Sequence, residues 1–480
     1  MLDILNDLIW SKLLIVMLIG LGLYFTIASR FVQFRYFGSM FRIFAEAFQR
    51  QPGQLSSFQA LMLSVAGRVG AGNIAGVAVA IMLGGPGAVF WMWLVALLGM
   101  ATSYFECSLA QLYKRREDDG TYRGGPAFYI QHGLGQRWLG IVVSILLLVT
   151  FGFGFNAVQS YTVASSLHDT FGVPTLASGI ALTVVIGLII FGGIKRIAKF
   201  ADVLVPVMAF SYIAMALVVI GLNLGEVPAV FALIFKSAFG LEPAFAGGIG
   251  AAIIMGVKRG LFSNEAGLGS APNVAAVAYV RHPASQGIVQ AFSVFIDTLI
   301  VCSCTAFIVL LGDVYQPGMS AQIGGVALTQ ASLAGLVGEW GRVFVSIALM
   351  LFGFTTIIYN YYLGENSLSW FSALGFGARH EALGVDHMGA KCRRPACQQR
   401  HLPPLRHGSQ SGGLKAIRLR GTLRGRQPNH RGRRALLPQL HHQPRSPRRI
   451  GRRDCCSTPC GGPRPSQCPD KHGTRPIANA

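Results

Sequence analysis

The sequence has 480 residues, 52% of them hydrophobic and only 13% charged, which excludes an ordinary soluble globular protein and favours a membrane protein. Its net charge of +21 does not indicate a nucleic-acid partner for the whole chain, because the charge is concentrated at one end. Residues 371–480 hold 22 Lys and Arg against 4 Asp and Glu, and residues 1–370 carry a net charge of only +3.

Nine segments are apolar over roughly the length of helix that crosses a bilayer core, about 20 residues. In chain order they are Leu13–Ser29, Leu55–Gly84, Ala88–Tyr113, Leu139–Leu167, Thr175–Ile194, Val203–Gly225, Pro243–Val257, Gln286–Gly312 and Val343–Gly364. The first does not read as a cleavable signal, because Asp3 and Asp7 precede it. The pattern predicts an all-α polytopic membrane protein with an extra N-terminal helix within residues 1–30.

The second segment is interrupted by glycines and a charged residue at residues 67–73, and the seventh is short and runs into residues 256–260, so both resemble broken helices. Broken helices at corresponding places in two halves are typical of an inverted-repeat transporter with its site near the membrane midplane. We therefore expect a five-helix repeat over residues 55–225 and an incomplete second repeat of three helices over residues 243–364.

The basic residues of the loops predict an orientation. If the amino terminus lies outside, the inner loops hold 15 Lys and Arg, with Lys258 and Arg259 among them, and the outer loops hold 3. The positive-inside rule then indicates a bacterial inner (plasma) membrane protein whose tail is cytoplasmic.

Residues 371–480 have a different character from the rest of the chain, with 12 of the 22 prolines and no apolar periodicity. Three explanations fit this composition: out-of-frame reading of a GC-rich gene, a disordered tail, or a basic arm that binds nucleic acid or anionic lipid. We favour the first, and so expect no nucleic-acid partner.

The segment Gly70, Ala71, Gly72 and Asn73 is the most informative of the chain. Glycines at this density loosen a helix, so that half-helix amino termini can hold a carboxylate and freed carbonyls can hold a cation. A zwitterionic amino acid with sodium would suit such a site, whereas the alternative is a close-packed face of small residues. Arg68 and Asn73 favour a site, because polar groups at membrane depth are costly unless they line a cavity.

Other polar side chains lie within the predicted spans. Asn156 and Gln159, three residues apart, share a helix face and suit the ammonium or carboxylate of a small substrate, or else bond neighbouring helices. Thr355 and Thr356 offer oxygen atoms to a hard cation, or else bond the preceding turn. Asp297 needs a partner, for which Arg68 is a candidate, and a structural ion pair is the favoured role.

The segment at 258–265 has two interpretations. Lys258, Arg259 and Glu265 form either a cytoplasmic charge cluster that gates the inner vestibule or an ordinary basic loop. No His/Glu metal set and no Ser/Asp dyad occurs at helical spacing in the spans, which disfavours an intramembrane enzyme.

Three strings carry a family resemblance: GAGNIAGVA at 70–78, GGPGA at 84–88 and RGLFSNEAG at 259–267. They resemble the alanine or glycine:cation symporters, the sodium:alanine symporter family of the amino acid-polyamine-cation superfamily, over roughly residues 1–370. The resemblance implies a LeuT-like fold of two inverted five-helix repeats that work by alternating access. The family has eleven spans, so the second repeat is expected to be truncated after the ninth.

The same resemblance implies residue roles. It places substrate at Gly70, Ala71, Gly72, Asn73, Asn156, Gln159, Met255 and Gly256, and sodium at Ala66, Val69, Phe352, Thr355 and Thr356. Arg68 stands where many family members have a small polar residue, so its charge could replace a second cation.

The resulting prediction is inward symport of alanine or glycine with sodium, or with a proton, without enzyme activity or cofactor. A passive channel and a non-functional truncated symporter are the alternatives. The sequence gives no prediction of oligomeric state, and the lipid bilayer is the only other partner expected.

Overall fold

The structure is a computed structural model that describes residue 9 and residues 13–46, 55–117, 120–241, 248–316 and 324–371. The described residues all belong to one compact unit. The prediction for the tail at 371–480 therefore falls outside the described residues except at Phe371.

The described chain is mostly helical, with one two-stranded antiparallel hairpin that the sequence analysis did not predict, β1 (Arg115–Arg116) and β2 (Tyr122–Arg123). The α-helices are α2 (Leu14–Ala28), α3 (Val32–Arg35), α4 (Phe37–Glu46), α5 (Ser57–Arg68), α6 (Val77–Gly84), α7 (Gly87–Leu112), α8 (Pro126–Gly133), α9 (Arg137–Val149), α10 (Asn156–Phe171), α11 (Thr175–Ile190), α12 (Gly193–Leu222), α13 (Val227–Ala238), α14 (Gly248–Asn264), α15 (Ala271–Ala275), α16 (Pro283–Val294), α17 (Ser303–Leu311), α18 (Gly325–Val337) and α19 (Trp340–Phe371). Three π-helical turns lie within or beside them: η2 (Gly72–Gly76), η3 (Thr150–Phe155) and η4 (Phe295–Cys302).

Six of the nine predicted spans are helical over a full membrane thickness. Five described stretches are long and apolar enough to cross a membrane, and the bent pair made by α5 with η2 and α6 makes a sixth. The other three predicted spans are helical as α2, α11 and α14, whose described lengths are 15, 16 and 17 residues. Because a crossing takes about 20 residues, the crossing of these three stays a prediction.

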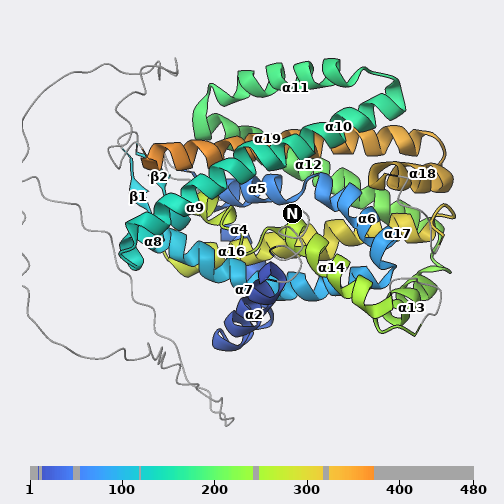
Figure 1. The fold of residues 1–480 in the computed structure, drawn as a ribbon, viewed down its shortest axis with the longest axis horizontal. Helices are drawn as coiled ribbons and strands as arrows, with labels where there is room; N and C mark the ends of the chain where they lie inside the picture. Colours follow the sequence, from blue (N-terminus) through green and yellow to red (C-terminus); the bar gives the residue numbers. More distant parts are fainter. Residues whose placement is uncertain are drawn as a thin grey trace, which may run out of the picture. The chain divides into compact units, whose positions relative to one another are not determined.

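The broken helix lies in the middle of the described bundle (Figure 1). Its first half, α5, packs against α12, α16 and α19, and its second half, α6, packs against α7, α14 and α18. The hairpin and α8 lie at one end of the bundle, and α13 and α18 lie at the other. The glycine-rich segment between α5 and α6 is therefore enclosed by helices from distant parts of the sequence.

The start and the end of α5 have identifiable causes. Ser56 and Gln59 form a capping box, in which the Ser56 hydroxyl accepts from the Gln59 amide N–H and the Gln59 side chain accepts from the Ser56 N–H. The helix ends after Arg68, and the chain then bends by 51° into η2 and α6. The predicted break of the first span is thus present at the predicted glycines.

The break expected at residues 256–260 is wrong. Helix α14 runs without interruption through Gly256 and Gly260 and ends at Asn264. A Cβ at Gly256 would lie 2.4 Å from the Ala88 carbonyl oxygen, and one at Gly260 would lie 3.3 Å from Met92 Cα. These glycines, four residues apart on one helix face, therefore allow α14 to approach α7 closely, as small residues do in membrane bundles.

The chain leaves the helix only after Asn264. Glu265 has a positive φ of 52°, and Gly267 and Gly269 follow with φ of 86° and 81°, a backbone conformation that favours glycine. Lys258 and Arg259 consequently lie inside α14 and not in a loop.

Candidate functional site

The C-terminal end of α5 presents a carbonyl that has lost its helical partner. In an unbroken helix the Gly70 N–H would donate to the Ala66 carbonyl. Here the Gly70 N–H donates instead to the Arg68 carbonyl (3.0 Å) and to Asn73 Oδ1 (2.9 Å). The Ala66 carbonyl accepts from Thr356 Oγ1 at 2.9 Å.

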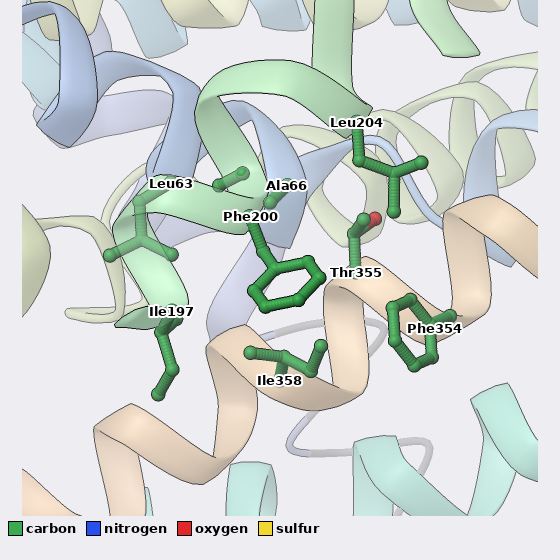
Figure 2. A pocket seen from close by; sticks show the side chains of 9 residues that line it. Leu63, Ala66, Ile197, Phe200, Leu204, Phe354, Thr355 and Ile358 are labelled. Carbon is green, nitrogen blue, oxygen red and sulfur yellow. The ribbon is translucent and has the colours of Figure 1, made fainter. Parts of the chain in front are cut away.

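Both predicted threonines lie at this end of α5. Thr356 Oγ1 and Thr355 Oγ1 also approach the Phe352 carbonyl, at 2.9 and 3.0 Å. Thr355 and Ala66 line a cavity whose other walls are apolar side chains of α5, α12 and α19 (Figure 2). Of the five predicted sodium ligands, four thus lie together, and Val69 caps the end of α5 beside them.

Gln159 reaches the loosened segment from α10. Its Oε1 accepts from the Ala71 N–H at 3.0 Å, and a Cβ at Gly70 would lie only 2.8 Å from Gln159 Nε2 and from Thr356 Oγ1. The absence of a side chain at Gly70 therefore allows these two side chains to approach closely. Asn156 bonds α19, where its Oδ1 accepts from Asn360 Nδ2 at 2.9 Å.

The residues that α14 brings to the segment are not those expected. Met255 and Gly256 lie against α6 and α7, where a Cβ at Gly84 would meet Met255 Cβ at 2.8 Å. Phe262 lies closest to Gly72, whose Cβ would be 3.2 Å from the ring. The difference follows from the uninterrupted course of α14, which carries the contact nearly two turns further along the helix.

Phe262 stacks on Phe155 of η3, with ring centroids 4.9 Å apart. The two rings cover the side of the loosened segment at Gly72. A hydrophobic residue next to a conspicuous motif gave no signal in the sequence, because aromatic residues are common in membrane helices.

Asp297 is completely buried and accepts from three neutral donors. Asn73 Nδ2 donates to Oδ1 at 2.6 Å, and Ser263 Oγ and Thr298 Oγ1 donate to Oδ2 at 3.0 and 2.6 Å. The ion pair with Arg68 considered from the sequence is not formed.

Arg68 is 2% exposed and donates to neutral groups as well. Nη1 donates to the Gln290 carbonyl at 3.1 Å and to Ser293 Oγ, and Nη2 donates to Ser103 Oγ at 2.9 Å. It therefore ties α5 to α7 and α16, and it acts electrostatically on Asp297 and on two further buried carboxylates, Glu106 and Glu265.

The cluster of Lys258, Arg259 and Glu265 is not assembled. The first two lie in mid-helix on α14, whereas Glu265 is 2% exposed and accepts from Ser270 Oγ at 2.5 Å. The interpretation of this segment as an ordinary basic loop is therefore wrong, because the helix continues through Lys258 and Arg259. Glu106, whose Oε1 accepts from the Gly267 N–H at 3.3 Å, was missed, although a carboxylate in an apolar run was a signal for it.

Residues 1–380 match the family model described as the sodium:alanine symporter family. The chain belongs to the sodium:alanine symporter family. This symporter is therefore a transporter and not an enzyme, and its several membrane-length helices make it a multi-pass membrane protein.

Individual relatives agree with this membership. The symporter is 51% identical over 370 residues to the amino-acid carrier protein AlsT of Bacillus subtilis, which covers 77% of this chain and 78% of that protein. It is 50% identical over 367 residues to a probable sodium/glutamine symporter of the same organism, GlnT, with 76% of each chain covered. It is 39% identical over 373 residues to the sodium/alanine symporter AgcS of Methanococcus maripaludis, covering 76% of this chain and 82% of that protein.

Among solved structures, the symporter is similar to a manganese transporter of Eremococcus coleocola with a TM-score of 0.47 and 15% identity, over 66% of this chain and 65% of that chain. A likeness of this degree supports no conclusion about fold or function.

The oxygen atoms at the end of α5 fit a hard cation. Carbonyl and hydroxyl oxygens are the ligands that sodium-like cations prefer, and the Ala66 and Phe352 carbonyls and the Thr355 and Thr356 hydroxyls supply only such atoms. The negative end of the α5 dipole adds to the attraction. Within the described part of the symporter, no group of three or more His, Cys, Asp and Glu could hold a transition metal.

Proposed function

We propose that this symporter carries a small neutral amino acid, alanine or glycine, into the cell with a sodium ion, by alternating access around the loosened segment. The observation that supports the proposal most strongly is the Ala66 carbonyl, released from its helix and met by the Thr356 hydroxyl at 2.9 Å. A cation there would bridge α5 and α19, so its binding and release would alter the contact between two helices that are far apart in the sequence.

The substrate would lie beside the cation, against Gly70, Gly72 and Gln159. The backbone N–H groups at the start of the second half-helix and the side chain of Gln159 suit a carboxylate and an ammonium group. Even a Cβ at Gly72 would lie only 3.2 Å from the Phe262 ring, which favours a substrate with a short side chain.

The wider architecture is proposed on the same basis. A LeuT-like arrangement of inverted repeats, with the broken helix α5–α6 as the moving element, would expose the site to each side in turn. The amino terminus would face outward from a bacterial inner membrane, and no cofactor would be required.

Vesicles that contain the purified 480-residue chain test the proposal. We expect saturable uptake of labelled alanine when sodium is higher outside, and less than about a tenth of that rate when choline replaces sodium. An imposed proton gradient distinguishes a proton from sodium as the coupling ion.

Competition identifies the substrate. Unlabelled glycine should inhibit alanine uptake, and glutamine is the informative competitor because a relative at 50% identity is named for it. Uptake that rises linearly with alanine concentration and ignores both ion gradients would instead indicate a passive pore.

A further inference from the structure

Asp297 joins three elements of the bundle. It lies in η4, and its two oxygens receive Asn73 from η2, Ser263 from the last turn of α14, and its own neighbour Thr298. Asp297, Asn73 and Thr298 are each 0% exposed. The carboxylate is therefore held from two other helices at once.

The Asn73 amide has two chemically different ends, and both are used. Its Oδ1 accepts from the Gly70 N–H at 2.9 Å, and its Nδ2 donates to Asp297 Oδ1 at 2.6 Å. If the amide were rotated by 180°, its Nδ2 would face the Gly70 N–H, and two donors would then oppose each other. Because a carboxylate only accepts, Asp297 fixes which end of the amide faces Gly70.

The hydrogen bond made by the Gly70 N–H in turn determines whether the Ala66 carbonyl, a proposed cation ligand, is available. As long as the Gly70 N–H is held by Asn73, it does not return to the Ala66 carbonyl, which stays available to Thr356. Gly70 also lies against Gln159, the side chain that holds the Ala71 N–H. One chain of contacts thus runs from η4 to the end of α5.

We propose that Asp297 is a positioning residue of this transporter, which through the Asn73 amide keeps the Gly70 N–H away from the Ala66 carbonyl and so keeps that carbonyl free for the coupling cation. The role in ion coupling rests on the proposed function. The positioning of the segment itself does not.

A series of variants in which the carboxylate and the amide are exchanged tests, in the full-length chain, whether Asp297 positions Gly70 through Asn73. Asn73→Asp keeps an acceptor for the Gly70 N–H but places a second carboxylate against Asp297. The double variant Asn73→Asp with Asp297→Asn restores the hydrogen bond between the two side chains, with residue 297 now donating and residue 73 accepting. Asp297→Ala removes the link altogether. Thr305→Val is the matched control, since Thr305 is equally buried further along the same helical run and bonds Tyr212 at 2.7 Å.

The first readout is hydrogen exchange of peptides that cover residues 66–76, followed by mass spectrometry. Exchange in this segment should rise by about tenfold in Asp297→Ala and in Asn73→Asp, and should return to the wild-type rate in the double variant. Thr305→Val should leave it unchanged. Unchanged exchange in Asp297→Ala, or a double variant as fast as Asn73→Asp, would overturn the proposal.

The second readout is the sodium concentration that gives half-maximal binding of labelled alanine, which a merely structural residue would not move selectively. It should rise about tenfold in Asn73→Asp and recover to within about threefold of wild type in the double variant, with the Thr305→Val value unaltered. If the wild-type chain binds no alanine in sodium, the proposed function fails, and the hydrogen-exchange result alone decides whether Asp297 is a positioning residue. Should Asp297→Ala not accumulate, the isosteric swap variants decide it.

Discussion

At the scale of single residues, the hydroxyl of Thr356 is the side-chain group that joins α19 to the freed carbonyl of α5. Thr356→Val keeps the shape of the side chain but removes this oxygen. We expect the sodium concentration for half-maximal alanine uptake to rise at least about tenfold, which corresponds to about 1.4 kcal/mol of lost cation binding. The measurement is alanine uptake by vesicles over a series of external sodium concentrations.

Two companion variants make this prediction specific. Thr356→Ser retains the hydroxyl and should behave like the wild type to within about threefold. Thr355→Val should have a smaller effect than Thr356→Val, because the Thr355 hydroxyl bonds only its own helix and Met208 Sδ, at 3.6 Å. Equal effects of both valine variants would contradict the assigned geometry.

Residue-scale prediction from the sequence succeeded where a motif itself determines the geometry. The glycines at 70 and 72 loosen the backbone locally, so their consequence could be anticipated. Which side chain a separate helix presents to that segment depends on the rotation and length of that helix. Asn156 was therefore expected near Gly70 but bonds Asn360, and Phe262 was not expected at all.

At the scale of elements, the contact between α14 and α7 depends on glycines that do not break the helix. Gly256→Ala would place a Cβ 2.4 Å from the Ala88 carbonyl oxygen and 2.6 Å from Trp91 Cβ. We expect this overpacking to cost about 1–3 kcal/mol, seen as a lower midpoint of thermal unfolding in detergent.

Gly250 provides the control on the same helix. A Cβ there would meet nothing within 4 Å, and alanine is favoured over glycine in a helix by about 1 kcal/mol. Gly250→Ala should leave the unfolding midpoint unchanged or raise it. A midpoint for Gly256→Ala as high as that of Gly250→Ala would show that the close approach of α14 to α7 is absent.

These glycines also explain why one predicted break is present and the other is wrong. Glycine supplies both a loosened backbone and a surface for close packing, and composition alone does not separate the two uses. At 67–72 the chain bends by 51°, whereas at 256–260 it stays helical and the positive-φ positions follow at 265–269.

At the scale of the whole molecule, apolar length identified helices well, because lipid leaves the backbone few alternatives to helical hydrogen bonding. All nine predicted spans contain helix. The short helices α13 and α18, at one end of the bundle, could not be separated from loops by apolar length alone (Figure 1). The predicted truncation of a second repeat after the ninth span concerns residues beyond α19, which lie outside the described residues.

The orientation of the molecule stays a prediction that labelling can check. Arg116 on β1 and Glu339 before α19 are both exposed, and the positive-inside rule puts them on opposite sides of the membrane. With the six tail cysteines replaced by serine, an impermeant maleimide added to intact cells should label Glu339→Cys but not Arg116→Cys. The reverse pattern would invert the predicted topology.

We propose that a cation binds where α5 ends and thereby permits an amino acid to bind beside it. Binding of labelled alanine to the purified chain, compared in sodium chloride and in choline chloride, tests this coupling without requiring transport. We expect saturable binding in sodium and a loss of affinity of at least about tenfold in choline. Equal affinity in the two salts would contradict it.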